Sequence, residues 1–471
     1  MNTPEFEEKL TNVLRSCFDD FDALHAVDRL SGGASQETYK IELSAGGKTL
    51  TAAMRRASGG EYENPDPARP GLATEARLMQ IARLADVPEP EIYRVLTPED
   101  DLGGGFIMEW LDGETLGSRI LKSPELNAIR PGLARACGQI LARIHGIDPL
   151  ESGLTTQLST VTTEDFIRKM WDQYQSYDTP QPMIDYTARW LLEHMPPEGK
   201  PRLVHNDFRN GNVMVTPEGI TAVLDWEVAH LGDPVRDIGW ICTNSWRFGR
   251  TDMRVGGFGH LEDLLDGYEE ESGIRIDPAH VHFWEVFGSF WWAAGCLKMA
   301  VRWRNGPDRT VERPGVARRN SECQADCVNL LIPGPVQLVE ETEPLSSLDT
   351  PRVDELLLSV RDFLREDVRA ATQGRDNFMA LVASNSLDIV LREMKLSPQA
   401  LRAEAERLSE LLGCEGEVMA LRWKLTEALR KGELSLDHPG LAAHLRNTAI
   451  NQLAIDQPRY SALETALSNG N

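Results

Sequence analysis

The chain has 471 residues, of which 41% are hydrophobic and 26% are charged, a composition that excludes wholesale disorder. Asp and Glu outnumber Lys and Arg by 73 to 49, which gives a formal net charge of −24. Because phosphate backbones repel so acidic a chain, we expect no nucleic-acid partner. No run of about 18 apolar residues occurs, so the sequence predicts no membrane span and no membrane partner.

The N-terminus and the cysteines bear on the compartment. Residues 1–20 are acidic and lack the basic and apolar regions of a signal peptide. Cys323 and Cys327 lie four residues apart, without the second pair that a zinc site needs, so we interpret them as reduced thiols of the core. These features predict a cytoplasmic protein.

The first 110 residues are predicted to be rich in strands. Residues 30–43 suggest a strand, a Gly-rich turn and a second strand, and Ala45-Gly-Gly-Lys48 predicts a hairpin turn before a strand at 49–56. Residues 73–84 have helical spacing, and 106–111 form a short apolar strand. Gly47-Lys48-Thr49 is not a phosphate loop, because position 42 is Glu where that loop needs Gly.

Helices dominate the next part, with one β-like island. We expect helices at 133–145 and across 261–304, and residues 204–215 and 220–225 form the β-like island, with a turn at Pro217-Glu-Gly219. Pro333, Gly334 and the acidic residues up to Pro344 predict a linker. Apolar residues then recur at helical spacing in five segments, 353–368, 377–395, 398–412, 417–430 and 439–453, which indicates a helical bundle.

One segment inside the island carries the strongest chemical signal. His205-Asn-Asp207-Phe-Arg-Asn-Gly-Asn212 places an acid and an amide five residues apart, and Asp225 follows 13 residues later, after a hairpin. Phosphoryl transfer needs a carboxylate that orients the attacking hydroxyl, an amide oxygen for Mg²⁺ and a second Mg²⁺-binding carboxylate. Each residue alone could serve an ordinary polar turn, but together they favour the functional interpretation.

With the following segment, His230 to Trp240, this motif resembles the aminoglycoside phosphotransferase-like family of small-molecule kinases. The resemblance covers about residues 20–332 and is strongest to the branch that forms the kinase part of certain multidomain acyl-CoA dehydrogenases. It implies an α+β, two-lobed protein-kinase-like fold with ATP and Mg²⁺ as cofactors, followed by a separate helical bundle. We expect a β-rich lobe at 1–110, a mainly helical catalytic lobe at 111–335 and the bundle at 351–471.

The resemblance also implies roles for single residues. Asp207 would be the catalytic carboxylate, His205 would brace its loop, and Asn212 and Asp225 would bind Mg²⁺. Asp233 and Asp237 would tie the next segment to this loop.

The nucleotide-binding residues match the family less tightly. Gly32, Gly33 and Ser35 would cover the phosphates. Arg55, or its neighbour Arg56, would replace the phosphate-binding Lys of kinases, with Glu75 as its partner. Adenine would meet the backbone of the segment that contains Glu109 and Leu111.

The sequence leaves the acceptor open. The net charge suits a cationic, aminoglycoside-like acceptor, whereas six arginines in 18 residues could hold the phosphate of a hydroxyacyl-CoA or simply form a solvated face: Arg302, Arg304, Arg309, Arg313, Arg318 and Arg319. Aromatic residues could line an acyl channel or belong to the core: Trp246, Phe248, Trp291 and Trp292.

Residues 351–471 resemble a domain of unknown function that is often encoded beside such kinases. Asn385 within it would satisfy a buried carbonyl or mark a binding surface. We therefore expect a kinase for a small-molecule hydroxyl, with the bundle available for protein contacts. The alternative is a catalytically weak pseudokinase or scaffold that binds a nucleotide or acyl-CoA.

Overall fold

The computed structural model describes residues 4–30, 36–62, 69–342 and 349–469. Two compact units divide the chain, and both are discontinuous in sequence. The first comprises residues 1–163, 197–242 and 246–281, and the second comprises residues 164–196, 243–245 and 282–471. The three domains predicted from the sequence are each continuous in the chain, and their boundaries stay predictions.

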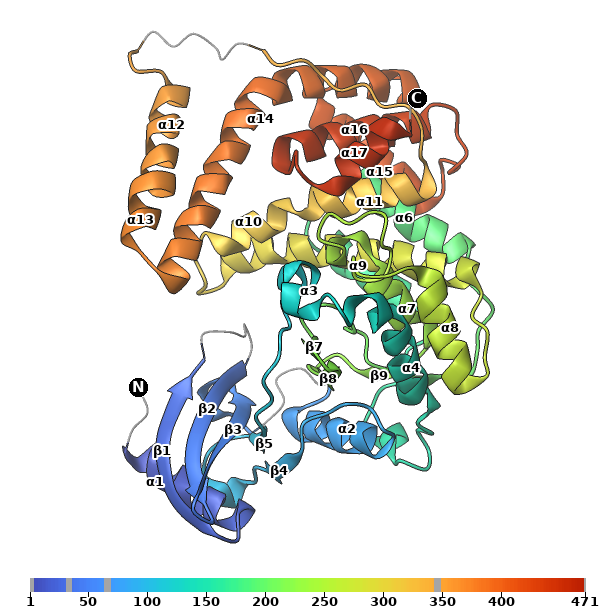
Figure 1. The fold of residues 1–471 in the computed structure, drawn as a ribbon. Helices are drawn as coiled ribbons and strands as arrows, with labels where there is room; N and C mark the ends of the chain where they lie inside the picture. The colour runs from blue at the N-terminus through green and yellow to red at the C-terminus, as the bar shows by residue number, and fades with distance from the viewer. Residues whose placement is uncertain (1–3, 31–35, 63–68, 343–348, 470–471) are drawn as a thin grey trace. The chain divides into compact units, whose positions relative to one another are not determined.

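A five-stranded antiparallel sheet opens the first unit (Figure 1), in the order β1-β2-β3-β5-β4. Alternate residues of β2, including Tyr39, Ile41 and Leu43, point into an apolar core that they share with α1. The elements of this part are α1 (Pro4–Cys17), β1 (Phe21–Arg29), β2 (Gln36–Ala45), β3 (Lys48–Ala57), α2 (Leu72–Leu84), β4 (Ile92–Val95) and β5 (Gly105–Glu109).

The remainder of the first unit contains two short two-stranded sheets. Strand β6 pairs with β9, and β7 pairs with β8. Helix α4 packs beside β6 and β8, and α8 packs against α4 (Figure 1). The elements are α3 (Gly117–Lys122), α4 (Leu133–Gly146), β6 (Arg202–Val204), β7 (Val213–Thr216), β8 (Gly219–Val223), β9 (His230–Gly232), α7 (Val235–Cys242) and α8 (Leu261–Ser272).

The second unit is helical in its described part. Its long α9 begins within the first unit and continues into the second. The helices are α5 (Thr163–Gln175), α6 (Pro182–Glu193), α9 (Pro278–Asn305), α10 (Glu312–Arg318), α11 (Asn320–Leu331), α12 (Val353–Phe363), α13 (Arg369–Ala371), α14 (Gly374–Leu412), α15 (Val418–Lys431), α16 (Leu441–Asp456) and α17 (Ser461–Ser468).

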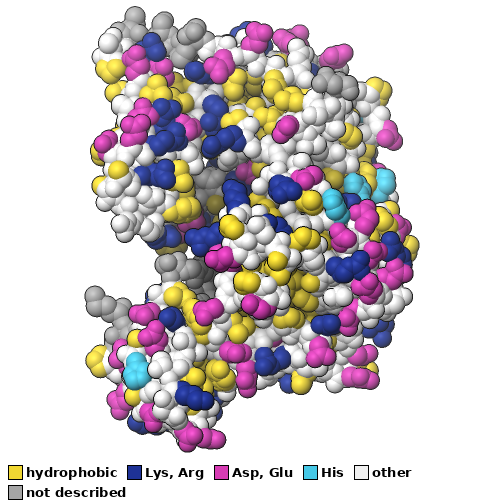
Figure 2. All heavy atoms as spheres, in the orientation of Figure 1, with side chains coloured by type: hydrophobic (Ala, Val, Ile, Leu, Met, Phe, Trp, Pro, Cys, Tyr) yellow, Lys and Arg dark blue, Asp and Glu magenta, His cyan; other side chains and the backbone are white. Residues whose placement is uncertain are grey.

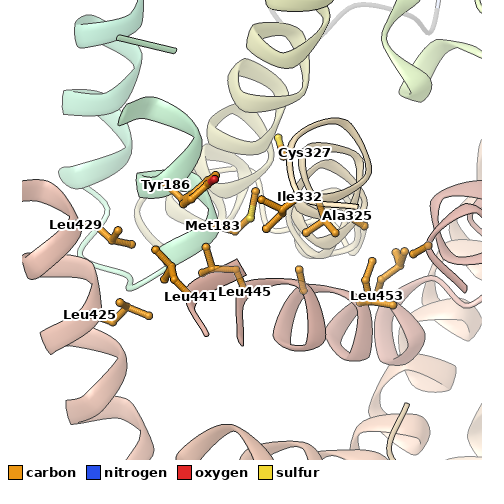
Figure 3. Packing of buried hydrophobic residues seen from close by; sticks show 14 of the residues in the cluster. Met183, Tyr186, Ala325, Cys327, Ile332, Leu425, Leu429, Leu441, Leu445 and Leu453 are labelled. Carbon is orange, nitrogen blue, oxygen red and sulfur yellow. The ribbon is translucent and has the colours of Figure 1, made fainter. Parts of the chain in front are cut away.

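The C-terminal helices share one hydrophobic core with two helices from earlier in the chain. Figure 3 shows Met183 and Tyr186 of α6 close to Leu441 and Leu445 of α16. Residues of α11, α14, α15 and α17 complete the same cluster. The bundle that the sequence predicts is present, and its core extends into α6 and α11.

The predicted short elements agree closely with the structure. The 45–48 turn joins β2 to β3, and the helices predicted at 73–84 and 133–145 correspond to α2 and α4. The strand predicted at 106–111 ends two residues early, at Glu109. The 261–304 segment is two helices, because Gly273 adopts the left-handed conformation and ends α8.

The break predicted between 395 and 398 is wrong, because α14 runs through Pro398. Proline removes one helical N–H, and its ring crowds the preceding turn. The helix changes direction along its length (Figure 1), and the Lys395 carbonyl, three residues before the proline, accepts hydrogen bonds from Thr342 N at 3.0 Å and Thr342 Oγ1 at 2.7 Å. The linker therefore satisfies a carbonyl near the proline.

The seven cysteines are free, and Cys323 and Cys327 are buried, as the sequence predicts. Burial raises the pKa of the Cys327 thiol to about 12, so it stays protonated.

Across the described residues, every helix is too short or too polar to span a bilayer.

Candidate active site

The loop between β6 and β7 carries the predicted catalytic residues, and Asp237 of α7 fixes its shape. Asn206 has a positive φ of 66°, a conformation that Asn tolerates better than most residues. Asp237 accepts hydrogen bonds from the backbone N–H of His205 at 2.9 Å and of Asn206 at 2.6 Å. Burial opposes the charge on Asp237, but its bond to His145 Nε2 at 3.1 Å helps to hold its pKa below the usual range.

His205 is buried inside this loop. Its Nδ1 accepts the backbone N–H of Asp207 at 3.2 Å, and its Nε2 lies 3.1 Å from the Leu224 carbonyl, so this contact places the ring proton on Nε2. Burial lowers the pKa of His205, which favours the neutral ring. The geometry agrees with a bracing residue that links the loop to the strand before Asp225.

Both carboxylate oxygens of Asp207 accept hydrogen bonds. Oδ1 accepts from Arg209 Nε at 2.9 Å and from Trp240 Nε1 at 2.8 Å. Oδ2 accepts from Asn212 Nδ2 at 2.6 Å. The Arg209 guanidinium also stacks 4.2 Å from the centroid of the Trp246 ring. Three donors therefore fix the orientation of the carboxylate.

Asn212 and Asp225 lie at neighbouring ends of the β7–β8 hairpin. Val213 pairs with Val223, and the Leu224 N–H donates to the Asn212 carbonyl at 2.7 Å. Asp225 adopts a positive φ of 70° directly after this pair. The hairpin thus brings the two predicted metal ligands together.

Their side-chain oxygens fit a magnesium ion. Asn212 Nδ2 donates to the backbone carbonyl and to the carboxylate of Asp207. Asn212 Oδ1 makes no hydrogen bond among the described residues. Asp225 Oδ1 binds Arg55, and Oδ2 accepts no hydrogen bond from this part of the chain. An amide oxygen and a carboxylate oxygen are hard donors of the kind that Mg²⁺ prefers.

Arg55 on β3 connects the sheet to Asp225. Its Nη2 lies 2.5 Å from Asp225 Oδ1, and its Nη1 lies 3.4 Å from Glu75 Oε2. Its Nε also donates to Gln36, and Gln36 donates to Glu75 Oε1 at 3.1 Å. Arg55 opposes the desolvation of Asp225 and holds the pKa of that carboxyl below the usual range.

Arg56 faces different partners. Its Nε donates to Glu37 at 2.7 Å, and its guanidinium lies over the Phe6 and Tyr39 rings. Adjacent strand residues point to opposite faces of a sheet, so only one of the pair can face Asp225. The geometry therefore favours Arg55 as the phosphate-binding cation.

The remaining predicted nucleotide residues are only partly described. Gly32, Gly33 and Ser35 lie outside the described residues. Glu109 ends β5 and pairs with Ala52, and the Leu111 N–H that follows makes no hydrogen bond within the described chain. A free backbone donor at the end of this strand suits an adenine ring edge.

Three side chains at the site escaped the sequence analysis: Gln36, Arg209 and Trp240. Arg209 lies two residues after Asp207, within the His205–Asn212 motif. Its position in the sequence therefore indicates that it can reach the Asp207 carboxylate. Gln36 and Trp240 reach the site only through the register of β2 with β3 and the packing of α7. Nothing in their local sequence reports those contacts.

The six predicted arginines do not form one free cluster. Arg313 pairs with Asp308, Arg318 pairs with Asp456 and Glu393, and Arg319 pairs with Glu322. The other three, Arg302, Arg304 and Arg309, are exposed and make no ion pair among the described residues.

The structure also bears on the predictions for the four aromatic residues and for Asn385. Trp246, Trp291 and Trp292 are half-buried, and Phe248 is 47% exposed, so none lies fully in a core. Asn385 is exposed and accepts from Arg365 Nη2 at 3.2 Å, so its predicted role at a buried carbonyl is wrong. The surface alternative for Asn385 stays open.

Comparison with known proteins identifies the class. Residues 26–274, more than half of the chain, match the phosphotransferase enzyme family, and the chain belongs to this family. Residues 370–460 match a domain of unknown function, DUF6285. The predicted kinase-like fold with mixed helices and strands is thereby confirmed.

Individual relatives refine this assignment. A candidate aminoglycoside phosphotransferase from Ralstonia eutropha superposes with a TM-score of 0.55 at 23% identity, over 68% of this chain and 96% of its own. Mouse acyl-CoA dehydrogenase family member 10 is 30% identical over 45% of this chain and 19% of its own length. Chicken family member 11 is 27% identical over 43% of this chain and 28% of its own. The matched regions are thus less than a third of both relatives.

Proposed function

We propose that this phosphotransferase moves the γ-phosphoryl group of ATP to a hydroxyl of a small molecule and that it depends on Mg²⁺. One observation carries the proposal. Asp207, Asn212, Asp225 and Arg55 form a single connected set, through the Asn212–Asp207 bond, the Asn212–Leu224 backbone bond and the Asp225–Arg55 ion pair. The set combines a hydroxyl-orienting acid, two oxygen ligands and a phosphate-binding cation.

The chemistry assigns a task to each side chain. Asp207 accepts the hydrogen bond of the acceptor hydroxyl and aims its oxygen at the γ-phosphorus. An O–P bond forms to that oxygen as the bond to the β-phosphate oxygen breaks, ADP leaves, and the hydroxyl proton passes to Asp207 or solvent. A bound Mg²⁺ supplies charge neutralisation for the phosphates. Asn212 and Asp225 would hold the ion, and Arg55 would clamp the phosphates.

For the acceptor, we propose a hydroxyl on an acyl-CoA in preference to an aminoglycoside. The named relatives are acyl-CoA dehydrogenase family members, although the matched regions cover only part of them. We further propose that the protein works in the cytoplasm, which its seven free thiols support.

The test is an acceptor screen with an Asp207→Ala control. Hydroxyacyl-CoAs, aminoglycosides, choline-like amines and sugars are offered with Mg-ATP, and ADP formation is measured. We expect one class to raise turnover at least about tenfold and Asp207→Ala to abolish transfer while it retains nucleotide binding. Unchanged turnover in this variant would remove the mechanism. Nucleotide binding without turnover for any acceptor would favour the scaffold alternative.

A further inference from the structure

A buried acid lies where the five-stranded sheet meets the β7–β8 hairpin. Glu89 belongs to the segment between α2 and β4 (Figure 1) and is only 3% exposed. Two contacts fix the backbone of this segment. Arg83 Nη1 donates to the Glu89 carbonyl at 2.6 Å, and the Val223 N–H at the end of β8 donates to the Pro88 carbonyl at 2.9 Å. The Glu89 side chain therefore starts from a fixed point beside the hairpin of the two proposed metal ligands.

The Glu89 carboxyl binds the residue that follows Asp225. Its Oε1 accepts a hydrogen bond from Trp226 Nε1 at 3.1 Å, and its Oε2 has no hydrogen-bond partner in the described chain. Burial raises the pKa of Glu89 well above its usual range, although the Trp226 N–H and Arg83 oppose this effect. The uncharged carboxyl is therefore favoured, and its bond to Trp226 is the one side-chain hydrogen bond it makes among the described residues.

Trp226 in turn contacts both halves of the candidate active site. It directly follows Asp225, whose positive φ of 70° is a conformation that few non-glycine residues adopt. Its indole is fully buried, and its centroid lies 4.5 Å from that of the His205 ring in the Asp207 loop. The indole has one polar atom, and a buried N–H without an acceptor is costly. The Glu89 acceptor therefore favours one position of this ring over others.

We infer that Glu89 is a positioning residue for phosphoryl transfer, because it holds the Trp226 indole and thereby fixes the backbone that presents Asp225 and the ring of His205. The inference rests on the proposed function, since Glu89 acts on the same site through Trp226. An uncharged acceptor is all that the indole N–H requires. Glutamine should therefore replace this acid, whereas leucine, which has a similar volume and no acceptor, should not.

The first test compares Glu89→Leu with Glu89→Gln in the full chain, with the acceptor from the screen. Glu89→Leu leaves the Trp226 N–H without its acceptor, so kcat should fall roughly 10- to 100-fold. The Mg²⁺ concentration for half-maximal activity should rise, because Asp225 is displaced, while the KM for the acceptor changes little. Glu89→Gln should keep most of the wild-type kcat and the wild-type response to Mg²⁺.

Glu37→Gln is the control for a loss of stability alone. Glu37 is another buried acid of the first unit, 7% exposed, and it pairs with Arg56 at 2.7 Å. Its variant should melt at a lower temperature than the wild type but keep kcat and the response to Mg²⁺.

Amide hydrogen exchange without nucleotide gives a readout that does not depend on activity. Residues 224–229 should exchange faster in Glu89→Leu than in the wild type, because the ring that orders this backbone has lost its anchor. Their exchange should be unchanged in Glu37→Gln.

Trp226→Phe tests the route from Glu89 to Asp225. It removes the N–H donor and keeps an aromatic ring, so kcat should fall as in Glu89→Leu, and the two substitutions together should lower kcat no further. This variant also decides the question if Glu89→Leu does not fold.

The inference is overturned if Glu89→Leu keeps the wild-type kcat and exchange, if glutamine lowers kcat as much as leucine, or if Trp226→Phe has normal kcat. In each of these cases, a wild-type activity that Asp207→Ala abolishes leaves the proposed function standing. A wild type without turnover for any acceptor would instead remove the proposed function, and this inference with it.

Discussion

At the scale of single residues, the hydrogen bonds of Asp207 define its part in catalysis. Arg209, Trp240 and Asn212 all donate to this carboxylate, and together they fix its orientation. A carboxylate held this way is a well-oriented hydrogen-bond acceptor. Its main contribution is therefore to aim the attacking hydroxyl, which a loosely dissociative phosphoryl transfer requires more than strong base catalysis.

Arg209 should act as a positioning residue for this carboxylate. Arg209→Met removes one donor to Asp207 Oδ1 and the stack on Trp246, while Trp240 and Asn212 still hold the acid. We expect kcat to fall roughly 10- to 100-fold with little change in the KM for ATP. Steady-state kinetics with the acceptor from the screen checks this. Arg250→Met, which removes an exposed arginine paired with Asp252, is the control and should leave kcat unchanged.

The opposite effect on kcat and KM would contradict the positioning role of Arg209. An Arg209→Met variant with normal kcat and a raised KM for ATP would instead make Arg209 a nucleotide-binding group.

Glu75 should make folding stability depend on pH. Burial raises the pKa of Glu75 to about 7, despite Arg55 nearby. Between the unfolded pKa of 4.5 and this value the native chain keeps a proton that the unfolded chain releases, so stability falls as pH rises. The unfolding free energy of the wild type minus that of Glu75→Gln should therefore drop by about 3 kcal/mol from pH 4.5 to pH 7.5.

Urea unfolding at several pH values measures this difference. A difference that stays constant over the range would show that Glu75 is ionised in the native state throughout, with Arg55 fully offsetting its burial.

At the scale of elements, close helix packing depends on two glycines. A Cβ at Gly138 of α4 would lie 2.0 Å from the Leu264 carbonyl oxygen of α8, and one at Gly267 would lie 2.2 Å from the Arg135 carbonyl oxygen. Both neighbours are backbone atoms that cannot move aside alone. These glycines let α4 and α8 approach each other closely.

Gly138→Ala should therefore lower the unfolding free energy by about 2–3 kcal/mol, the cost of overpacking a tight contact. Gly146→Ala at the end of the same helix is the control, because its Cβ would meet nothing within 4 Å. Thermal or urea unfolding of the two variants measures the contrast. Equal stability of both would contradict the close approach of the helices.

The elements also show what the sequence can and cannot reveal. Periodicity locates α2 and α4 because each buries a regular apolar stripe against its neighbours. It splits α14 at Pro398, because proline is a strong local signal against a helix, whereas the packing of α14 against α15 and α16 is not visible in the local sequence. Asp207, Asn212 and Asp225 are recognisable from their spacing in one loop and the hairpin that follows it, whereas Gln36 and Trp240 reach the site through tertiary packing that spacing does not report.

At the scale of the whole molecule, the chain combines an acidic composition with local basic regions. On the face shown in Figure 2, Lys and Arg side chains gather over the region of α12 and α14. Arginines of this part of the chain pair with nearby acids, as Arg361 and Arg365 do with Asp388. The net charge of −24 therefore says little about which anion or cation an individual site prefers.

The shared core of the second unit should make its early and late segments unfold together. Leu445→Ala removes a side chain that is 2% exposed in the cluster of α6, α11 and α16, and should cost about 2–5 kcal/mol. Amide hydrogen exchange in α6 should accelerate together with that in α16. Met419→Ala, at a 51% exposed position of α15, should change neither. Unchanged protection of α6 in Leu445→Ala would separate that helix from the bundle.

The central claim is tested most directly by Mg²⁺-dependent ATP hydrolysis without an acceptor, compared between the wild type and Asp225→Ala, with Mg-ATP binding measured in parallel. We predict slow hydrolysis by the wild type, with water replacing the acceptor hydroxyl. In Asp225→Ala, hydrolysis should fall to background, and the affinity for ATP should cease to depend on Mg²⁺. Equal hydrolysis by the two proteins, or Mg²⁺-dependent binding that survives without this carboxylate, would contradict the account.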